Sequence, residues 1–304
     1  MEIIKPGINI NFTGRRKQAL VFSLIMILIS VIALSIRGGL NYGIDFAGGT
    51  EVVLKFNDTV EIAEIRDSLN QLNLGDVEVQ RFGAKETNQY LIRIEHTTTE
   101  LEGLSAEVES HLQERFGEGS LETLRSEMVG PKVGKDLRRK GMLAVLSAVI
   151  GMLIYITWRF ELRFGVGAII ALIHDVVITL GVLALTNSEF NLPTIAALLT
   201  VVGYSVNDTI VISDRIRENL RKIRKKTQEE VVNVSINETL SRTILTSGTT
   251  LLVCITLFLL GGPVIHVFAL VLIVGFSIGT YSSIFIATPV LLFWKERFPK
   301  KIRR

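Results

Sequence analysis

The sequence has little of what soluble enzymes use for chemistry. It contains one cysteine, Cys254, so it forms no disulfide bond within itself. The segment Gly130–Asp136 is one residue short of a Walker A loop and lacks its Ser/Thr. Gly203-Tyr-Ser205 lacks the last glycine of a nucleophile elbow, and no His, Cys or carboxylate group has metal-ligand spacing. These absences exclude an ATPase, a hydrolase and a zinc site, and no enzyme activity or cofactor is expected.

Apolar residues are abundant instead, at 48% of the 304 residues. A helix needs about 20 apolar residues to cross a bilayer core of about 30 Å. Six stretches meet this length, so the sequence predicts an α-helical polytopic membrane protein. The first stretch is longer than the apolar core of a signal peptide, and we expect it to be retained. The predicted spans are 18–36, 141–158, 164–186, 192–213, 243–261 and 267–293.

Basic residues predict the orientation of these spans. They crowd the N-terminal segment 1–17, the loop Arg159–Arg163, the segment 214–242 and the tail 294–304. The positive-inside rule therefore predicts that both termini are cytoplasmic. A further basic cluster at 132–140 lies on the predicted outer side, but it follows a long loop, where the rule is weak. Residues 215–228 are expected to form a polar helix along the cytoplasmic surface.

The outer segment 37–140 has the composition of a soluble domain with a linker. Alternating apolar residues predict strands at 50–56, 77–82 and 89–95, with a fourth at 121–129. Helical spacing predicts helices at 59–72 and 98–116, the second with Thr98 or Thr99 near its start. The order β-α-β-β-α-β is that of a ferredoxin-like α+β domain.

Charged residues inside the apolar spans are the main functional signal. Asp208 lies in the fourth span, Asp175 in the third, and Arg242 at the start of the fifth. A charged side chain at membrane depth costs at least about 2.5 kcal/mol, so it needs a partner, water or a function. Asp208 is roughly 9 Å from the cytoplasmic end of its span, at ~1.5 Å per residue. An Asp208–Arg242 pair is therefore feasible, whereas Asp175 is expected at a different depth.

Such a pair is suited to proton coupling. Desolvation favours the neutral form of a carboxyl group, and a nearby arginine favours the ionised form. A conformational change that separates the two groups would then make the carboxyl take up a proton. The alternative is a static salt bridge that only fixes helix packing. The polar neighbours expected to support the site are Tyr204, Ser205, Asn207 and His174.

Glycines mark two further places. Gly43, Asp45, Gly48 and Gly49 lie just outside the first span and predict either a hinge into the outer domain or a tight turn that needs glycine. The pair Gly275 and Gly279, at i and i+4, is typical of a face where helices pack closely.

Together these motifs resemble the SecF family of bacterial protein-export membrane proteins, and the resemblance covers essentially the whole chain. Each motif is short, but their order and topology are specific. The motifs are Gly43-x-Asp-Phe-x-Gly-Gly-Thr50, His174-Asp175, Gly203-Tyr-Ser-x-Asn-Asp-Thr209, Ser213-Asp-Arg-Ile-Arg-Glu-Asn219 and Ser241-Arg-Thr-x-x-Thr-Ser247.

The resemblance implies half of an RND-like helix bundle that pairs with SecD in the bacterial inner (plasma) membrane. It implies association with the SecYEG channel, YajC as a further candidate partner, and use of the proton-motive force to move and release preproteins. The residues matching Asp208 and Arg242 are then proton-path residues, alongside an aspartate of SecD. Asp175 is assigned to the path with a less definite role. The chain is similar to the form in which SecD and SecF are separate.

Two other readings compete with this one. The chain could be another RND-type transporter that exports a small molecule or lipid, or a structural subunit whose buried charges only hold helices together. Pumps of the RND type usually have twelve spans and larger paired outer domains, which this chain lacks. Binding of nucleic acid by the basic segments is not expected, because beside membrane spans such segments mark orientation and anionic lipid.

Overall fold

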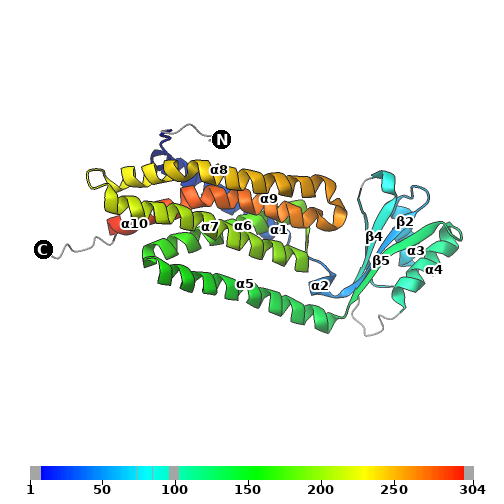
Figure 1. Cartoon of the computed structure of the whole chain (residues 1–304). Helices are drawn as coiled ribbons and strands as arrows, with labels where there is room; N and C mark the ends of the chain where they lie inside the picture. The colour runs from blue at the N-terminus through cyan, green and yellow to red at the C-terminus, as the bar shows by residue number, and fades with distance from the viewer. Residues whose placement is uncertain (1–7, 73, 84, 96–102, 298–304) are drawn as a thin grey trace. The chain divides into compact units, whose positions relative to one another are not determined.

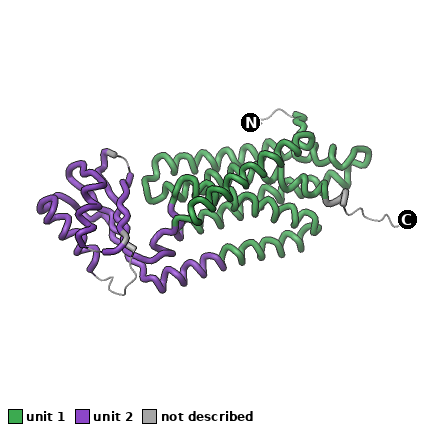
Figure 2. Tube along the Cα trace, turned by 180° about the vertical axis from the view of Figure 1, so that it is seen from behind, with its two compact units in different colours: residues 1–41, 144–188, 193–304 green, residues 42–143, 189–192 purple. Residues whose placement is uncertain are grey.

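The computed structural model describes residues 8–72, 74–83, 85–95 and 103–297. The chain forms two compact units (Figure 2). Unit 1 comprises residues 1–41, 144–188 and 193–304, and unit 2 comprises 42–143 and 189–192. The segment 189–192 joins helices α6 (Leu162–Thr186) and α7 (Leu192–Lys222), so the connection between these two helices belongs to unit 2.

Unit 1 is a bundle of long helices (Figure 1). Within the described residues, six helical segments are long and apolar enough to cross a membrane. The helices and helical turns that build them, besides α6 and α7, are η1 (Thr13–Arg15), α1 (Arg16–Ile36), α5 (Pro131–Arg159), α8 (Gln228–Leu260), α9 (Gly262–Ser282), the π-helical turn η3 (Ser283–Ala287) and α10 (Thr288–Arg297).

Most of these helices extend beyond the apolar stretches from which they were predicted. Helix α5 begins ten residues before the expected start at 141, and α8 includes the polar residues 228–242. The prediction of a separate surface helix over 215–228 is wrong. Helix α7 continues to Lys222, and α8 begins after Thr227, whose side chain makes a capping box with Glu230. The expected tail 294–304 and N-terminal segment 1–17 are described only in part.

Close packing in unit 1 depends on small residues. A Cβ atom on Gly275 of α9 would collide with the Val201 side chain of α7, and one on Gly279 would lie 3.0 Å from the Cβ atom of Ser205. The predicted packing role of these two glycines is confirmed. Small residues allow helix backbones to approach closely where lipid gives no hydrophobic driving force between helices. This approach places α9 beside the polar residues of α7.

Unit 2 contains the expected α+β fold. Its elements run β2 (Gly49–Phe56), α3 (Ile62–Asn70), β3 (Asp76–Arg81), β4 (Gln89–Glu95), α4 (Leu104–Phe116) and β5 (Leu121–Val129). The strand order is β3-β4-β2-β5, and every neighbouring pair is antiparallel, as in ferredoxin-like domains. The expected start of the second helix, at Thr98 or Thr99, lies outside the described residues. Shorter elements of the chain are β1 (Asn41–Tyr42), α2 (Ile44–Ala47), η2 (Lys85–Thr87) and β6 (Glu189–Phe190).

One face of this sheet forms the core of unit 2, because alternate residues of each strand point the same way. Val52, Leu54 and Ile92 are fully buried there with Ile65 of α3 and Val108 of α4. The remaining strand residues point to the other face of the sheet, which carries charge.

A buried arginine organises that charged face. Arg93 of β4 is 3% exposed and stands opposite Glu51 of β2 and Glu78 of β3 in the strand register. Its guanidinium lies 3.6 Å and 3.4 Å from these two carboxylates, and it also pairs with Glu189 of β6. The cluster therefore holds the segment between α6 and α7 on the sheet. Burial raises the pKa of Glu51 above its ordinary value of 4.5; Glu189 adds to this rise, whereas Arg93 opposes it.

The glycine packing makes a first prediction. Gly275→Ala should destabilise the helix bundle by about 1–3 kcal/mol, because the added methyl group overlaps Val201 and forces a shift. Thermal unfolding in detergent measures the effect. Gly151→Ala in α5 is the control, since a Cβ atom there meets nothing within 4 Å. Equal melting temperatures for wild type and Gly275→Ala would show that α7 and α9 are not packed this closely.

The charged face makes a second prediction. Because the pKa of Glu51 is higher in the folded state than in the unfolded state, wild type should lose stability as the pH rises through that raised pKa. Glu51→Gln should remove this loss and slow hydrogen exchange of the β2 and β4 amides at neutral pH. Exchange rates of the full chain, corrected for intrinsic chemistry, are measured from about pH 4.5 upward.

The matched control is Glu114→Gln, at an exposed position of α4. That variant should follow the wild-type pH dependence. The idea is refuted if Glu51→Gln loses protection with rising pH as steeply as wild type does.

Candidate functional site

Asp208 lies in the middle of the helix bundle and is bound by hydroxyl groups. Its side chain extends from α7, and the residue is 7% exposed. Thr243 of α8 donates a hydrogen bond to Oδ1 at 3.0 Å, and Ser283 of η3 donates to Oδ2 at 2.7 Å. The carboxyl group thus joins three parts of unit 1 that are far apart in the sequence.

The expected ion pair between Asp208 and Arg242 is absent from this structure. No described Lys or Arg nitrogen lies within 4.0 Å of the Asp208 carboxylate, and Arg242 is exposed. The reason is helical geometry, since neighbouring residues on a helix point about 100° apart. Thr243 faces α7, so Arg242 points away from it. The Arg242 charge is nevertheless close enough to act electrostatically on Asp208.

A second buried carboxyl group lies at Asp175 of α6, which is fully buried. Ser205 of α7 donates to its Oδ2 at 2.6 Å, and Ser282 of α9 donates to the same atom at 2.8 Å. The Nδ1 atom of His174 is 2.9 Å from Oδ1. Ser205 therefore supports Asp175 and not Asp208.

The two aspartates do not contact each other directly, as the sequence indicated. They are connected through short polar residues on shared helices. Ser205 and Asp208 are three positions apart on α7, and the neighbouring residues Ser282 and Ser283 contact one aspartate each. The structure thus brings Asp175 and Asp208 into one polar layer across α6, α7, α8 and the end of α9.

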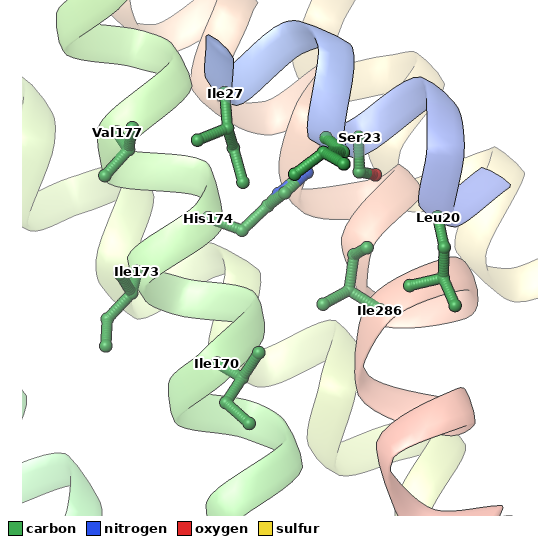
Figure 3. Close-up of a pocket in the computed structure, with 9 residues that line it drawn as sticks. Leu20, Ser23, Ile27, Ile170, Ile173, His174, Val177 and Ile286 are labelled. Atoms are coloured by element: carbon green, nitrogen blue, oxygen red, sulfur yellow. The ribbon is translucent and has the colours of Figure 1, made fainter. Parts of the chain in front are cut away.

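His174 connects this layer to an apolar cavity of roughly 400 Å³ between α1 and α6 (Figure 3). Its ring extends from α6 toward α1 and stacks on Tyr281, with the ring centroids 6.1 Å apart. The Nε2 atom is buried and has no hydrogen-bond partner among the described residues. Ser23 also lines the cavity. The apolar lining includes Leu20, Ile27, Ile170, Ile173, Val177 and Ile286.

The other predicted supporting residues contribute less. Tyr204 is half-buried and points to Ser247 of α8, with 3.4 Å between the two hydroxyl oxygens, so it touches neither aspartate. Asn207 is exposed, and its side chain makes no hydrogen bond to a described residue. Helix geometry again explains this difference, because Asn207 precedes the buried Asp208 and points elsewhere.

The glycine-rich segment after α1 has a defined structure in unit 2. Gly43 donates its N–H to the carbonyl of Phe190, and Asp45 accepts a hydrogen bond from the backbone N–H of Leu192 at 2.9 Å. Asp45 therefore satisfies a free donor at the start of α7. Gly48 and Gly49 have φ of 84° and 123°, values that favour glycine. The geometry is that of a tight turn, and the hinge stays a prediction.

Sequence reasoning missed three residues of the site, namely Thr243, Ser282 and Ser283. Thr243 lies within the motif that begins at Ser241, which was the available signal. The two serines had no signal, because serine is common in membrane helices. All three are hydroxyl residues, and a hydroxyl both donates and accepts hydrogen bonds, so it can serve an ionised or a protonated carboxyl group. The arrangement is therefore able to hold a proton on an aspartate or to release it.

Comparison with known proteins identifies the family. Residues 108–297 match the family described as protein export membrane protein SecD/SecF, C-terminal, and residues 32–60 match the SecD/SecF GG motif. The chain is 46% identical over 305 residues to the protein translocase subunit SecF of Magnetococcus marinus, covering 99% of this chain and 97% of that protein. It is 44% identical to SecF of Vibrio alginolyticus, covering 96% and 91%.

Solved structures agree with this comparison. A crystal structure of SecDF from Thermus thermophilus, described as a translocon-associated membrane protein, has a TM-score of 0.84 and 38% identity. It covers 96% of this chain, while this chain spans 39% of that one. SecDF in its super-membrane-facing form has a TM-score of 0.71 at 38% identity, covering 98% and 40%.

The fold, the six apolar helices and the matched motifs thus agree with one another. The expected α-helical membrane protein with one small α+β domain is confirmed. The chain belongs to the SecD/SecF family of protein-export membrane proteins.

Proposed function

We propose that this chain is a SecF-type subunit of the Sec protein translocase. With SecD it uses the proton-motive force to help preproteins pass through and leave the SecYEG channel. It works in the inner membrane with both termini in the cytoplasm, and it is not an enzyme. The proton path passes through Asp208 and is gated by Arg242, with Asp175 as a second site on the path and YajC as a further candidate partner.

The observation that carries this proposal is the set of partners around Asp208. Its carboxyl group is buried among helices and contacts two hydroxyls, with no cation within 4.0 Å. An ionised carboxylate is costly in such a place, whereas a protonated one is not. A structural salt bridge would need the cation in contact. The geometry therefore favours a group that takes up and releases protons.

Arg242 can act as a gate because of its position next to Thr243. A rotation of α8 by about 100°, the angle between successive helical residues, would replace the Thr243 hydroxyl with the Arg242 guanidinium. The arriving charge would favour the ionised carboxylate and expel the proton. The reverse rotation would restore the hydroxyl contact and allow uptake. Proton flow is then tied to the motion of one helix.

SecD is needed to complete this path. The chain spans 39% of the SecDF protein that it resembles, so the rest of that assembly must come from elsewhere. Several apolar helix faces of unit 1 are exposed and suit contact with lipid or a membrane partner. The resemblance to the family supplies SecD as the partner and one of its aspartates as a further proton site.

Replacement of Asp208 tests the proposal. Asp208→Asn should assemble with SecD, because an amide can still make hydrogen bonds to Thr243 and Ser283. It should lose the whole gain in preprotein export that a proton gradient gives to wild type. Export is measured in vesicles with and without a gradient, at matched abundance. Asp214→Asn, an exposed position on the same helix, is the control. A full gradient response in Asp208→Asn would refute the proton role.

Replacement of Arg242 tests the gate. Arg242→Met should assemble normally, because the guanidinium has no ion pair with a described residue here. Export should nevertheless lose its response to the gradient, since the proton cannot be expelled from Asp208. The same vesicle assay applies, with Arg221→Met at an exposed position of α7 as the control. If Arg242→Met keeps the wild-type response, Arg242 is not the gate.

A further inference from the structure

Two neighbouring serines at the end of α9 contact two different aspartates. Ser282 and Ser283 are both fully buried. Ser282 donates to Asp175 Oδ2 at 2.8 Å, and Ser283 donates to Asp208 Oδ2 at 2.7 Å. Successive residues of a helix diverge by about 100°, which allows one turn to reach aspartates on α6 and α7. The end of α9 is therefore bound to both buried carboxyl groups at once.

Each serine also has a second acceptor. The Ser282 hydroxyl oxygen is 3.1 Å from the carbonyl oxygen of Gly279, and that of Ser283 is 2.9 Å from the carbonyl oxygen of Thr280. A hydroxyl has one hydrogen to donate. It can direct that hydrogen fully to the carboxylate or to the backbone carbonyl, and the choice depends on whether the carboxyl group carries a proton.

We propose that Ser282 and Ser283 are positioning residues that switch their hydrogen bonds when the aspartates are protonated. This inference rests on the proposed proton role of Asp208. When Asp208 is ionised, Ser283 donates to it. When a proton from the gradient binds Oδ2, the new O–H donates to the Ser283 oxygen, and the Ser283 hydrogen turns to the Thr280 carbonyl. No bond within serine breaks. Ser282 acts in the same way between Asp175 and Gly279.

The place of the switch in the helix gives it a mechanical consequence. The π-helical turn η3 begins at Ser283, directly after the α-helical part. Such turns occur often at functional sites and interrupt the regular backbone hydrogen bonds. A hydroxyl that gains or leaves a carbonyl of the preceding turn changes the backbone bonding at this junction. The orientation of α9 then responds to the protonation of both aspartates.

The charged and titratable groups around the switch are few among the described residues. His174 of α6 contacts Asp175, and Tyr281 of α9 stacks on His174. Arg242 of α8 acts on Asp208 from outside contact distance. A pH titration of the layer is therefore assigned with variants of both aspartates.

Infrared spectroscopy of the SecD-bound complex in lipid bilayers tests the switch. The carboxyl band of Asp208 is identified as the band lost in Asp208→Asn, and that of Asp175 as the band lost in Asp175→Asn. Ser283→Ala should change the frequency of the Asp208 band. Its midpoint should move to higher pH by about one unit, because the ionised form loses a donor. The pH-linked change in the backbone carbonyl band should also shrink. Ser282→Ala should act on the Asp175 band.

Ser277→Ala is the matched control, because Ser277 is exposed on α9 and donates only to the Ile273 carbonyl. It should leave both aspartate bands and their midpoints unchanged. If Ser283→Ala does not assemble, Ser283→Cys keeps a similar volume with a weaker donor, and the same upward shift is expected. An Asp208 band that is unmoved by either variant overturns the inference.

The spectroscopic result is separate from the test of function. If wild-type export gains nothing from a proton gradient, the proposed function fails, while a moved Asp208 band still supports the hydroxyl switch. If wild type responds to the gradient but the band is unmoved in the serine variants, only the switch fails.

Discussion

The arrangement of unit 1 depends on keeping two carboxyl groups inside an apolar bundle. Neither aspartate has an arginine or lysine in contact, so hydroxyl groups from other helices must satisfy them. This requirement fixes which side of α8 and which turn of α9 face α6 and α7. The glycines of α9 meet the same requirement, because the serines reach the aspartates only if the backbones approach closely.

The same requirement explains why the outer part of the chain bears on the site. Asp175 and Asp208 lie on α6 and α7, and the segment that joins these helices is bound in unit 2. There Arg93 pairs with Glu189, and Asp45 accepts a hydrogen bond from the first residue of α7. The glycine-rich motif therefore has a structural task besides any hinge motion, since it holds the start of the helix that carries Asp208.

How much of this was accessible from the sequence depends on the range of the interactions. Strands and helices of the outer domain follow from local alternation and spacing, and β4 has the predicted bounds. The buried aspartates follow from their cost in an apolar span. The error concerned Arg242, because spacing shows that two residues are near in depth but not which side of a helix faces its neighbour. Ser282 and Ser283 could not be found, since their role appears only when α9 is packed against α7.

Hydroxyl groups in place of a permanent ion pair are what a reversible proton site requires. A contacting arginine would hold an aspartate ionised, and a purely apolar wall would hold it protonated. Hydroxyls satisfy either form, so the energy difference between the two states stays small enough for a modest helix motion to reverse it. Arg242, one residue from Thr243, supplies a charge that such a motion can bring in or take away. The balance between these two neighbours on α8 would then decide the protonation of Asp208.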